Sequence, residues 1–298
     1  MRPMKTFKHY DATTIEETIS ILKEYQDKAK ICAGGTALLD TMKRRILPTP
    51  EVVVNIKNIP GLNEIKEDEE GLKIGPLVTL SEIEKSGTIK SKYEVLSEAV
   101  ASSATPAIRN MATAAGSICQ HVRCWYYLKS DFFCFRKGGP ICFAATGDNR
   151  YHSIMEQAVC VAASPSDLTT ALVALNAKLT IQGPEGTREV ELKDFYVTLG
   201  NLLKPDEIII SIVVPQAPSK STFKRAAIRK AIDFALSSVA AASTDKGTTV
   251  ALGGVAPVPI SGTPDEITAA LDKATPLSDN KYKVPMTKAL LRDALAAV

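Results

Sequence analysis

Four cysteines stand out as residues whose type and spacing could do chemistry: Cys124, Cys134, Cys142 and Cys160. The sequence around them shows neither helical nor strand periodicity, and aromatic residues alternate with glycines and charges. A loop this long needs something to hold it, and bonds from thiolates to a metal would do so. We therefore predict a metal-cluster loop over residues 119–160.

The nature of the metal stays open on spacing alone. Four soft thiolates suit an iron–sulfur cluster. Zinc is one alternative, although zinc ligands usually come in closely spaced cysteine pairs, which this loop lacks. Buried cysteines that bind nothing are another, because free cysteine is often buried. The neighbouring rings predict a hydrophobic wall that keeps water from a cluster; they are Trp125, Tyr126, Tyr127, Phe132 and Phe133.

Three turns rich in small residues could bind a phosphorylated ligand. The first, Ala33-Gly34-Gly35-Thr36, is expected between a strand and a helix. Glycines there let the backbone approach an anion, and free N–H groups at the helix start point at phosphate oxygens. A tight turn that binds nothing is the alternative for a single such segment. Similar turns follow at 109–118 and 252–257, which favours a phosphate site.

Regular elements are expected on both sides of these motifs. Residues 1–60 resemble a small βαβ unit with the glycine pair at its strand-to-helix turn. Ser164-Pro165-Ser166-Asp167 is a strong helix start. Periodicity predicts helices near 11–22, 79–85, 93–101, 166–175, 265–273 and 286–298, and strands near 30–33, 51–56, 65–78, 158–163, 207–214, 236–242 and 250–255.

Bulk composition excludes several classes of protein. The chain has 298 residues, 45% of them hydrophobic, as in an ordinary globular protein. Its net charge of +3 comes from interleaved basic and acidic residues, so we expect neither a nucleic-acid nor a membrane partner. Six cysteines, four of them in one loop, favour metal or redox use over disulfides and a cytoplasmic location. Periplasmic export within a complex stays open as the alternative.

The three turns, in this order, resemble those of the FAD-binding subunit of the molybdenum hydroxylases, a family that includes carbon monoxide dehydrogenase, xanthine dehydrogenase and aldehyde oxidoreductases. The resemblance covers essentially the whole chain, and it extends to the segments 163–168 and 223–235. Two positions depart from the family pattern. Ala37 lacks the usual polar side chain, and Ala115 replaces a common glycine, which requires a negative φ there.

The resemblance implies FAD as the cofactor. Backbone N–H groups of 33–38 and 113–117 would wrap its diphosphate. The family's lysine falls on Arg225, which keeps the charge that would favour an anionic reduced flavin but changes its geometry. A surface ion-pair strand of Arg225, Arg229 and Asp233 is the alternative. The predicted FAD-binding residues are Ala33, Gly34, Gly35, Thr36, Ala37, Leu38, Ile108, Asn110, Thr113, Gly116, Ser117, Ser164, Asp167 and Arg225.

The cysteine loop resembles one branch of this family. In that branch, which includes 4-hydroxybenzoyl-CoA reductase and a bacterial aldehyde oxidoreductase, the FAD subunit carries a four-iron four-sulfur cluster on an inserted loop. The resemblance implies such a cluster on the four cysteines named first. Cys160 would supply the fourth ligand because Tyr151 stands where the benzoyl-CoA enzyme type has a cysteine, and Cys119 is its competitor.

The resemblance also implies a fold, partners and a function. The fold would be α+β: two FAD-binding lobes of the vanillyl-alcohol-oxidase-like (PCMH) type at 1–60 and 61–180, then a smaller α/β domain of the CO dehydrogenase flavoprotein type, with an antiparallel sheet, at 181–298. The chain would pass electrons between a two-iron two-sulfur small subunit and an external partner such as ferredoxin or NAD. A molybdenum-cofactor large subunit would carry out the substrate reaction. A stand-alone flavin oxidoreductase and a zinc-stabilised nucleotide-binding module are the rival hypotheses.

Overall fold

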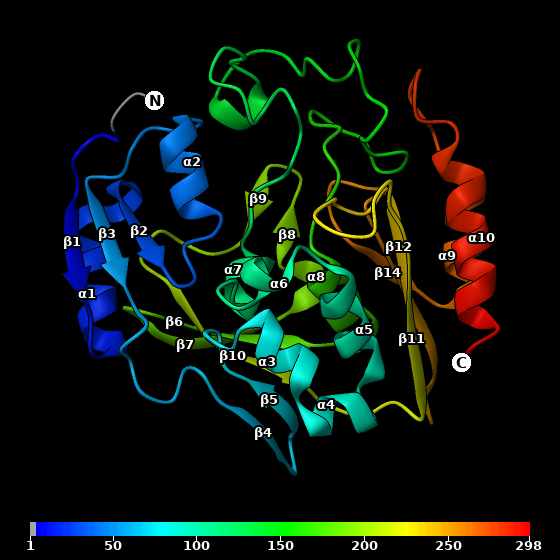
Figure 1. Cartoon of the computed structure of the whole chain (residues 1–298), viewed down its shortest axis with the longest axis horizontal. Coiled ribbons are helices and arrows are strands. Elements are labelled where there is room, and N and C mark those ends of the chain that lie inside the picture. The colour runs from blue at the N-terminus through cyan, green and yellow to red at the C-terminus, as the bar shows by residue number, and fades with distance from the viewer. Residues whose placement is uncertain (1–3) are drawn as a thin grey trace.

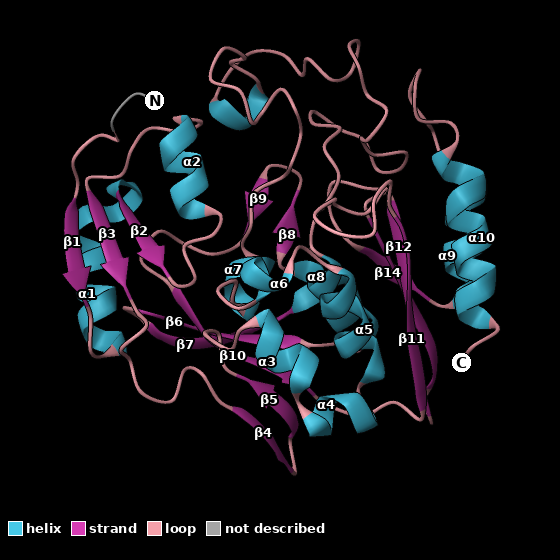
Figure 2. Ribbon diagram, in the orientation of Figure 1, coloured by secondary structure: helices cyan, strands magenta, loops and turns pink. Residues whose placement is uncertain are grey.

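The computed structural model describes residues 4–298, which form a mixed α and β fold in three parts (Figures 1 and 2). A parallel sheet lies at one side, and an antiparallel sheet with helices packed on it occupies the middle. A second antiparallel sheet, covered by the C-terminal helices, lies at the other side. No helix within residues 4–298 is long and apolar enough to cross a membrane.

The N-terminal part is a parallel sheet with the strand order β1-β3-β2. Its elements are β1 (Lys8–Asp11), α1 (Ile15–Tyr25), β2 (Ala29–Cys32), α2 (Leu38–Arg44) and β3 (Val52–Asn55). The central strand β3 is a run of buried valines, as expected for a strand covered on both faces. The predicted βαβ unit is confirmed. The helix begins after Thr14 because the Thr14 hydroxyl accepts the Glu17 N–H, whereas Asp11 ends β1.

The middle sheet is antiparallel and has the order β4-β5-β10-β6-β7. Its strands are β4 (Ile65–Asp68), β5 (Gly71–Ile74), β6 (Lys178–Gly183), β7 (Gly186–Glu191) and β10 (Ile208–Val214). Strand β10 pairs with both β5 and β6, so the middle part of the fold extends to Val214. The predicted boundary between 180 and 181 cuts β6 and is therefore wrong.

Helices cover this middle sheet in Figure 1. They are α3 (Leu80–Lys85), α4 (Gly87–Lys92), α5 (Glu94–Ser102), α6 (Pro106–Arg109), α7 (Ala114–Ile118) and α8 (Asp167–Ala174), and a short hairpin, β8 (Tyr196–Val197) and β9 (Gly200–Asn201), lies nearby. Helix α8 is buried along its whole length because it lies between the middle sheet and the C-terminal sheet. A helix in that position has to be apolar all round, and apart from Asp167 and two threonines this one is.

The C-terminal part is an antiparallel sheet with the order β11-β12-β13-β14, covered by two helices. Its elements are β11 (Lys220–Ala226), β12 (Ser237–Thr244), β13 (Gly247–Gly253), β14 (Ile260–Gly262), α9 (Pro264–Asp272) and α10 (Lys283–Leu295). Alternate residues of β12 enter different cores: Ala240 and Ala242 join the core of the middle part, and Val239 and Ala241 join the core under α9 and α10. The strands predicted near 236–242 and 250–255 lie in this sheet under two helices as expected, whereas the strand predicted near 207–214 lies in the middle sheet as β10.

The segment between α7 and α8 is a long irregular loop that runs across the top of Figure 1. Its regular structure is a single helical turn at Phe135–Lys137 and a bridge between Cys134 and Ile141. The predicted strand at 158–163 is wrong. Val161 and Ala162 are buried as an apolar run should be, but the Val161 carbonyl accepts the N–H of Ser153 from the same loop rather than from a sheet.

Candidate functional site

The first glycine turn presents a row of free backbone donors. The turn follows β2 and leads into α2, whose N-cap, Ala37, makes no side-chain cap bond. Within the described part of the chain, the N–H groups of residues 34–38 donate to no protein acceptor. Successive free N–H groups at a helix start form a concave surface that suits the oxygens of a phosphate.

Gly34 lets the second turn lie against the first. A Cβ atom at position 34 would stand 2.8 Å from the carbonyl carbon of Met111 and 3.2 Å from the Cα of Ala112. Gly35 has a φ of +71°, a conformation that favours glycine. The structure therefore brings together the two turns that the sequence keeps far apart, and it needs both glycines to do so.

The second turn is built differently from the first. The Thr113 hydroxyl caps α7 by accepting the Gly116 N–H at 3.3 Å, and the N–H groups of 114, 115 and 117 donate to backbone carbonyls. The prediction that the N–H groups of 113–117 face a diphosphate is therefore wrong for four of these five positions in this conformation, because helix and sheet contacts use them. Ala115 lies inside α7 with a negative φ, as its replacement of a glycine requires.

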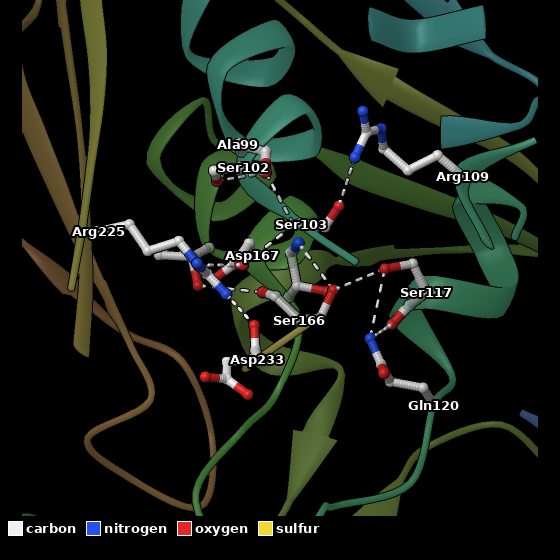
Figure 3. Close-up of polar contacts among 12 residues, drawn as sticks. Ala99, Ser102, Ser103, Arg109, Ser117, Gln120, Ser166, Asp167, Arg225 and Asp233 are labelled. Atoms are coloured by element: carbon white, nitrogen blue, oxygen red, sulfur yellow. Dashed lines mark hydrogen bonds and ion pairs between the residues drawn. The ribbon is translucent and has the colours of Figure 1, made fainter. Parts of the chain in front are cut away.

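A buried ion pair lies at the start of α8 (Figure 3). Arg225 of β11 donates from Nε to Oδ2 of Asp167 at 2.9 Å, and both side chains are buried. The same carboxylate oxygen accepts the Ser103 hydroxyl at 3.0 Å, and Arg225 also donates to the backbone carbonyl of Asp233. Burial raises the pKa of Asp167, and the adjacent guanidinium opposes that rise.

A second polar contact joins the α7 turn to the start of α8. The hydroxyls of Ser117 and Ser166 lie 3.0 Å apart, and Gln120 donates to the Ser117 carbonyl (Figure 3). Ser166 also caps α8 by accepting the Thr169 N–H at 3.1 Å. Ser164 is buried, and its N–H donates to the carbonyl of Ala256 in the third turn. The predicted residues of the second, third and helix-start segments therefore lie together.

Some site residues differ from expectation. Ser103 and Arg109 belong to the network but are missing from the predicted set: Arg109 donates to the Ser103 carbonyl at 2.9 Å and pairs with Glu84. Arg109 stands in the second turn, whereas nothing in the sequence marks Ser103. The alternative of a surface ion pair holds for Arg229 and Asp233, which pair in a largely exposed loop, but not for the buried Arg225.

Two predicted residues of the second turn face outward. Ile108 is 38% exposed, and Asn110 lines an open depression beside the start of α3. In the first turn Thr36 is exposed, while the backbone around it is half-buried. These side chains are therefore free to contact a ligand that lies on the two turns.

The four predicted cysteines line one cavity. Cys124, Cys134, Cys142 and Cys160 line one small cavity of about 10 Å³, and the rings of Tyr126, Tyr127, Phe135 and Phe143 complete its wall. Within residues 4–298, no group of three or more His, Cys, Asp or Glu side chains converges on a single metal-ion position. The four thiols thus face a shared space rather than one point.

The competing ligand, Cys119, lies elsewhere. It packs against the core of the middle part rather than lining the cavity, and burial raises the pKa of its thiol to about 12. Cys32, just before the first turn, contacts the core side of that turn, where its sulfur would lie 3.5 Å from a Cβ at Gly35. Among these cysteines, the geometry groups Cys160 with the other three.

Polar groups contact two of the cavity sulfurs. Arg136 donates from Nε to Sγ of Cys160 at 3.2 Å, and the Cys142 thiol together with Arg136 lowers the pKa of Cys160 below the usual value of a thiol. His152 Nε2 lies 3.2 Å from Sγ of Cys124. Burial lowers the pKa of His152 to about 4, so its ring is neutral at physiological pH. The cavity can therefore hold the thiolate of Cys160 beside a fixed guanidinium, whereas burial raises the pKa of Cys124.

The predicted aromatic wall is only partly formed by the expected rings. Tyr126 and Phe132 pack edge to face with centroids 5.0 Å apart, and Tyr127 is buried. Trp125 and Phe133, by contrast, are 45% and 59% exposed. Alternation along an irregular turn places neighbouring rings on opposite sides, which composition alone does not reveal.

Comparison with known proteins agrees with this arrangement. Residues 5–217 match the family described as the FAD-binding domain in molybdopterin dehydrogenase. The match includes both contacting turns, the cysteine loop and the middle sheet. The chain belongs to this family.

The relatives of this chain are oxidoreductase subunits. It is 32% identical to the aldehyde oxidoreductase FAD-binding subunit PaoB of Escherichia coli (strain K12), with 98% of each chain covered. It is 24% identical to the carbon monoxide dehydrogenase medium chain of Hydrogenophaga pseudoflava, over 98% of this chain and 96% of that one. A structure of carbon monoxide dehydrogenase from that organism superposes with a TM-score of 0.77 at 22% identity, covering 99% and 98% of the two chains. The fold is thus shared across the full length, and the chain is an oxidoreductase subunit with an FAD-binding domain.

Proposed function

We propose that this chain is the electron-transfer flavoprotein subunit of a multi-subunit molybdenum hydroxylase. The observation that carries the proposal is the contact between the two turns, which sets the free N–H groups of residues 34–38 beside the second turn. The buried pair of Asp167 and Arg225 follows Ser166, whose hydroxyl lies 3.0 Å from that of Ser117 in the second turn.

FAD would lie between the two N-terminal lobes, in the PCMH manner. Residues 33–38 would hold its diphosphate with the free N–H of Thr113, and Ile108, Asn110, Gly116 and Ser117 would line the same site. Ser164, Asp167 and Arg225 would lie at the isoalloxazine end. Bound FAD supplies the exchange of electron pairs and single electrons.

Arg225 would act there as a cation whose charge is partly offset. Its Nε is committed to Asp167 at 2.9 Å, so the guanidinium keeps a fixed orientation while its net field is reduced. The Ser103 hydroxyl donates to the same carboxylate oxygen and so helps to hold this arrangement. Arg225 would therefore orient and polarise the flavin ring, and it would add less than a full positive charge beside that ring.

We propose further that the cysteine cavity holds one four-iron four-sulfur cluster. Four thiols around a shared space match the donor set of such a cluster, whereas a single zinc ion needs ligands that converge on one point. Arg136 at the Cys160 sulfur would offset part of the negative charge of the thiolates. The cluster would be a second site of electron exchange, which passes single electrons to or from an external carrier such as ferredoxin. The competing role is purely structural: the cluster would only hold the loop in place.

The partners would be a large subunit with the molybdenum cofactor and a small subunit with two-iron two-sulfur clusters, and NAD is an alternative external partner. The relatives named above support this, since they are called an FAD-binding subunit and a medium chain. We propose a cytoplasmic complex.

One preparation tests the cofactors. The purified chain should be yellow, release FAD on denaturation, and contain iron and sulfide but no stoichiometric zinc. A colourless protein with zinc would favour the nucleotide-binding module instead. To test the electron-transfer role of the cluster, the complex is reduced with its substrate and the cluster is followed by low-temperature paramagnetic resonance. A cluster that keeps one oxidation state while the flavin cycles would leave only the structural role.

A further inference from the structure

Lys283 is a buried cation held by carbonyl groups. It is the first residue of α10, its side chain is completely buried, and its ammonium donates to the carbonyls of His152 at 2.9 Å and Gly254 at 2.6 Å. Among residues 4–298, no carboxylate lies within ion-pair distance of its Nζ, and burial lowers its pKa to about 7. A buried charge costs several kcal/mol unless it is compensated, so a negative group nearby would stabilise it.

His152 links this ammonium to the cysteine cavity. The His152 carbonyl that accepts the Lys283 bond belongs to the residue whose ring nitrogen lies 3.2 Å from Sγ of Cys124. Asn280 holds the same stretch of the loop, because its amide donates to the carbonyls of His152 and Ser153 at 3.2 and 3.0 Å. Two side chains of the C-terminal segment thus bind the same part of the loop: the amine of Lys283 and the neutral amide of Asn280.

We infer that Lys283 sets the reduction potential of the cluster in the cysteine cavity, an inference that rests on the proposed cluster. A cluster on four thiolates is an anion, and uptake of one electron makes it more negative. In surroundings of low dielectric constant, the ammonium form of Lys283 stabilises this reduced form more than the oxidised one. Lys283 touches neither the cavity nor a cysteine, so it is a positioning residue that acts through its field.

The test is a potentiometric titration of the full-length, iron-loaded protein, purified without oxygen. Dithionite supplies the electron, and the reduced cluster is followed by paramagnetic resonance. Lys283→Met removes the charge at similar length, and Lys283→Gln removes it while keeping a donor for the carbonyls. Asn280→Ala removes neutral hydrogen bonds to the same loop, together with the acceptor of the Leu277 N–H. Lys288→Met is the matched control, because Lys288 is an exposed lysine of the same helix that pairs with Asp272.

Both neutral variants at 283 should show a more negative potential at unchanged iron content, and Asn280→Ala and Lys288→Met should match the unaltered protein. An unchanged potential in an iron-loaded neutral variant would overturn the inference, and so would an equal shift in Asn280→Ala, which would assign the effect to the grip on the loop. Loss of iron from both neutral variants but not from Lys283→Arg would make the charge a requirement for holding the cluster and also overturn it. Absence of iron from the unaltered protein would instead remove the proposed cluster itself.

Discussion

Replacing Gly34 by alanine should separate the two glycine turns and release the flavin. The added Cβ would lie 2.8 Å from the carbonyl carbon of Met111 and 3.2 Å from the Cα of Ala112. Carbon atoms in contact normally stand about 3.5–4.0 Å apart. Since both neighbours are backbone atoms, no side-chain rotation relieves the clash, and the turns must move apart by about 1 Å.

A shift of that size is large compared with the range of a hydrogen bond. Donor and acceptor atoms lie about 2.7–3.2 Å apart in good hydrogen bonds, so opening by about 1 Å takes one wall of the phosphate site out of range. Overpacking of this kind usually costs about 1–3 kcal/mol, and the rigid backbone on both sides places Gly34→Ala at the upper end. About 3 kcal/mol corresponds to roughly 100-fold weaker binding of FAD.

The assay is the dissociation constant of FAD, measured by titrating the flavin-free protein and following flavin fluorescence. Gly87→Ala is the matched control, because a Cβ there meets nothing within 4 Å and the residue opens α4. Gly35→Asp is a less selective change, since its Cβ would point at the side chains of Leu39 and Cys32 and its φ is +71°. An FAD affinity of Gly34→Ala equal to that of Gly87→Ala would refute the idea that the two turns form one cradle.

Three further outcomes follow from the site. Arg225→Met should lower the free energy of unfolding by about 3–5 kcal/mol at neutral pH, because it leaves the Asp167 carboxylate buried and unpaired. That loss should shrink as the pH falls and the carboxylate takes up a proton, and a loss independent of pH in denaturant titrations would contradict the pair. Ser166→Ala should cost about 1 kcal/mol in the same assay by removing the cap of α8. Iron analysis should show loss of metal in Cys160→Ser but not in Cys119→Ser, and the reverse result would move the fourth ligand to Cys119.

Local signals predicted much of the fold. The glycine pair before α2, the Ser166 cap of α8 and the run of small and apolar residues in β12 each depend on neighbours within a few positions. Such patterns are set by backbone sterics and by local composition, and both are visible in the sequence. The contact between the two turns was predictable only through the family resemblance, since no pattern in either turn specifies its partner.

Long-range pairing explains what the sequence did not reveal. The boundary near residue 180 is wrong because β10 returns to pair with β5, and pairing of that kind leaves no mark in local periodicity. On sequence alone, a surface ion pair is an alternative for Arg225 because its buried partner, Asp167, lies 58 positions away in the sequence. Ser103 enters the site for a similar reason: a lone serine at a helix end carries no signal until the carboxylate it contacts is known.

The cysteine loop and the proposed flavin site are joined, because the loop leaves and rejoins the fold at hydrogen-bonded neighbours. Helix α7, which precedes the loop, and the cap of α8, which follows it, are joined by the Ser117 and Ser166 hydroxyls 3.0 Å apart. A long loop with adjacent ends adds little closure entropy, since that cost grows only with the logarithm of length. Cys160 lies seven residues before Asp167, and an extended chain advances at most about 3.6 Å per residue, so the two cannot be more than about 25 Å apart. Any change of charge in the cavity is therefore made close to the residues proposed to hold the flavin.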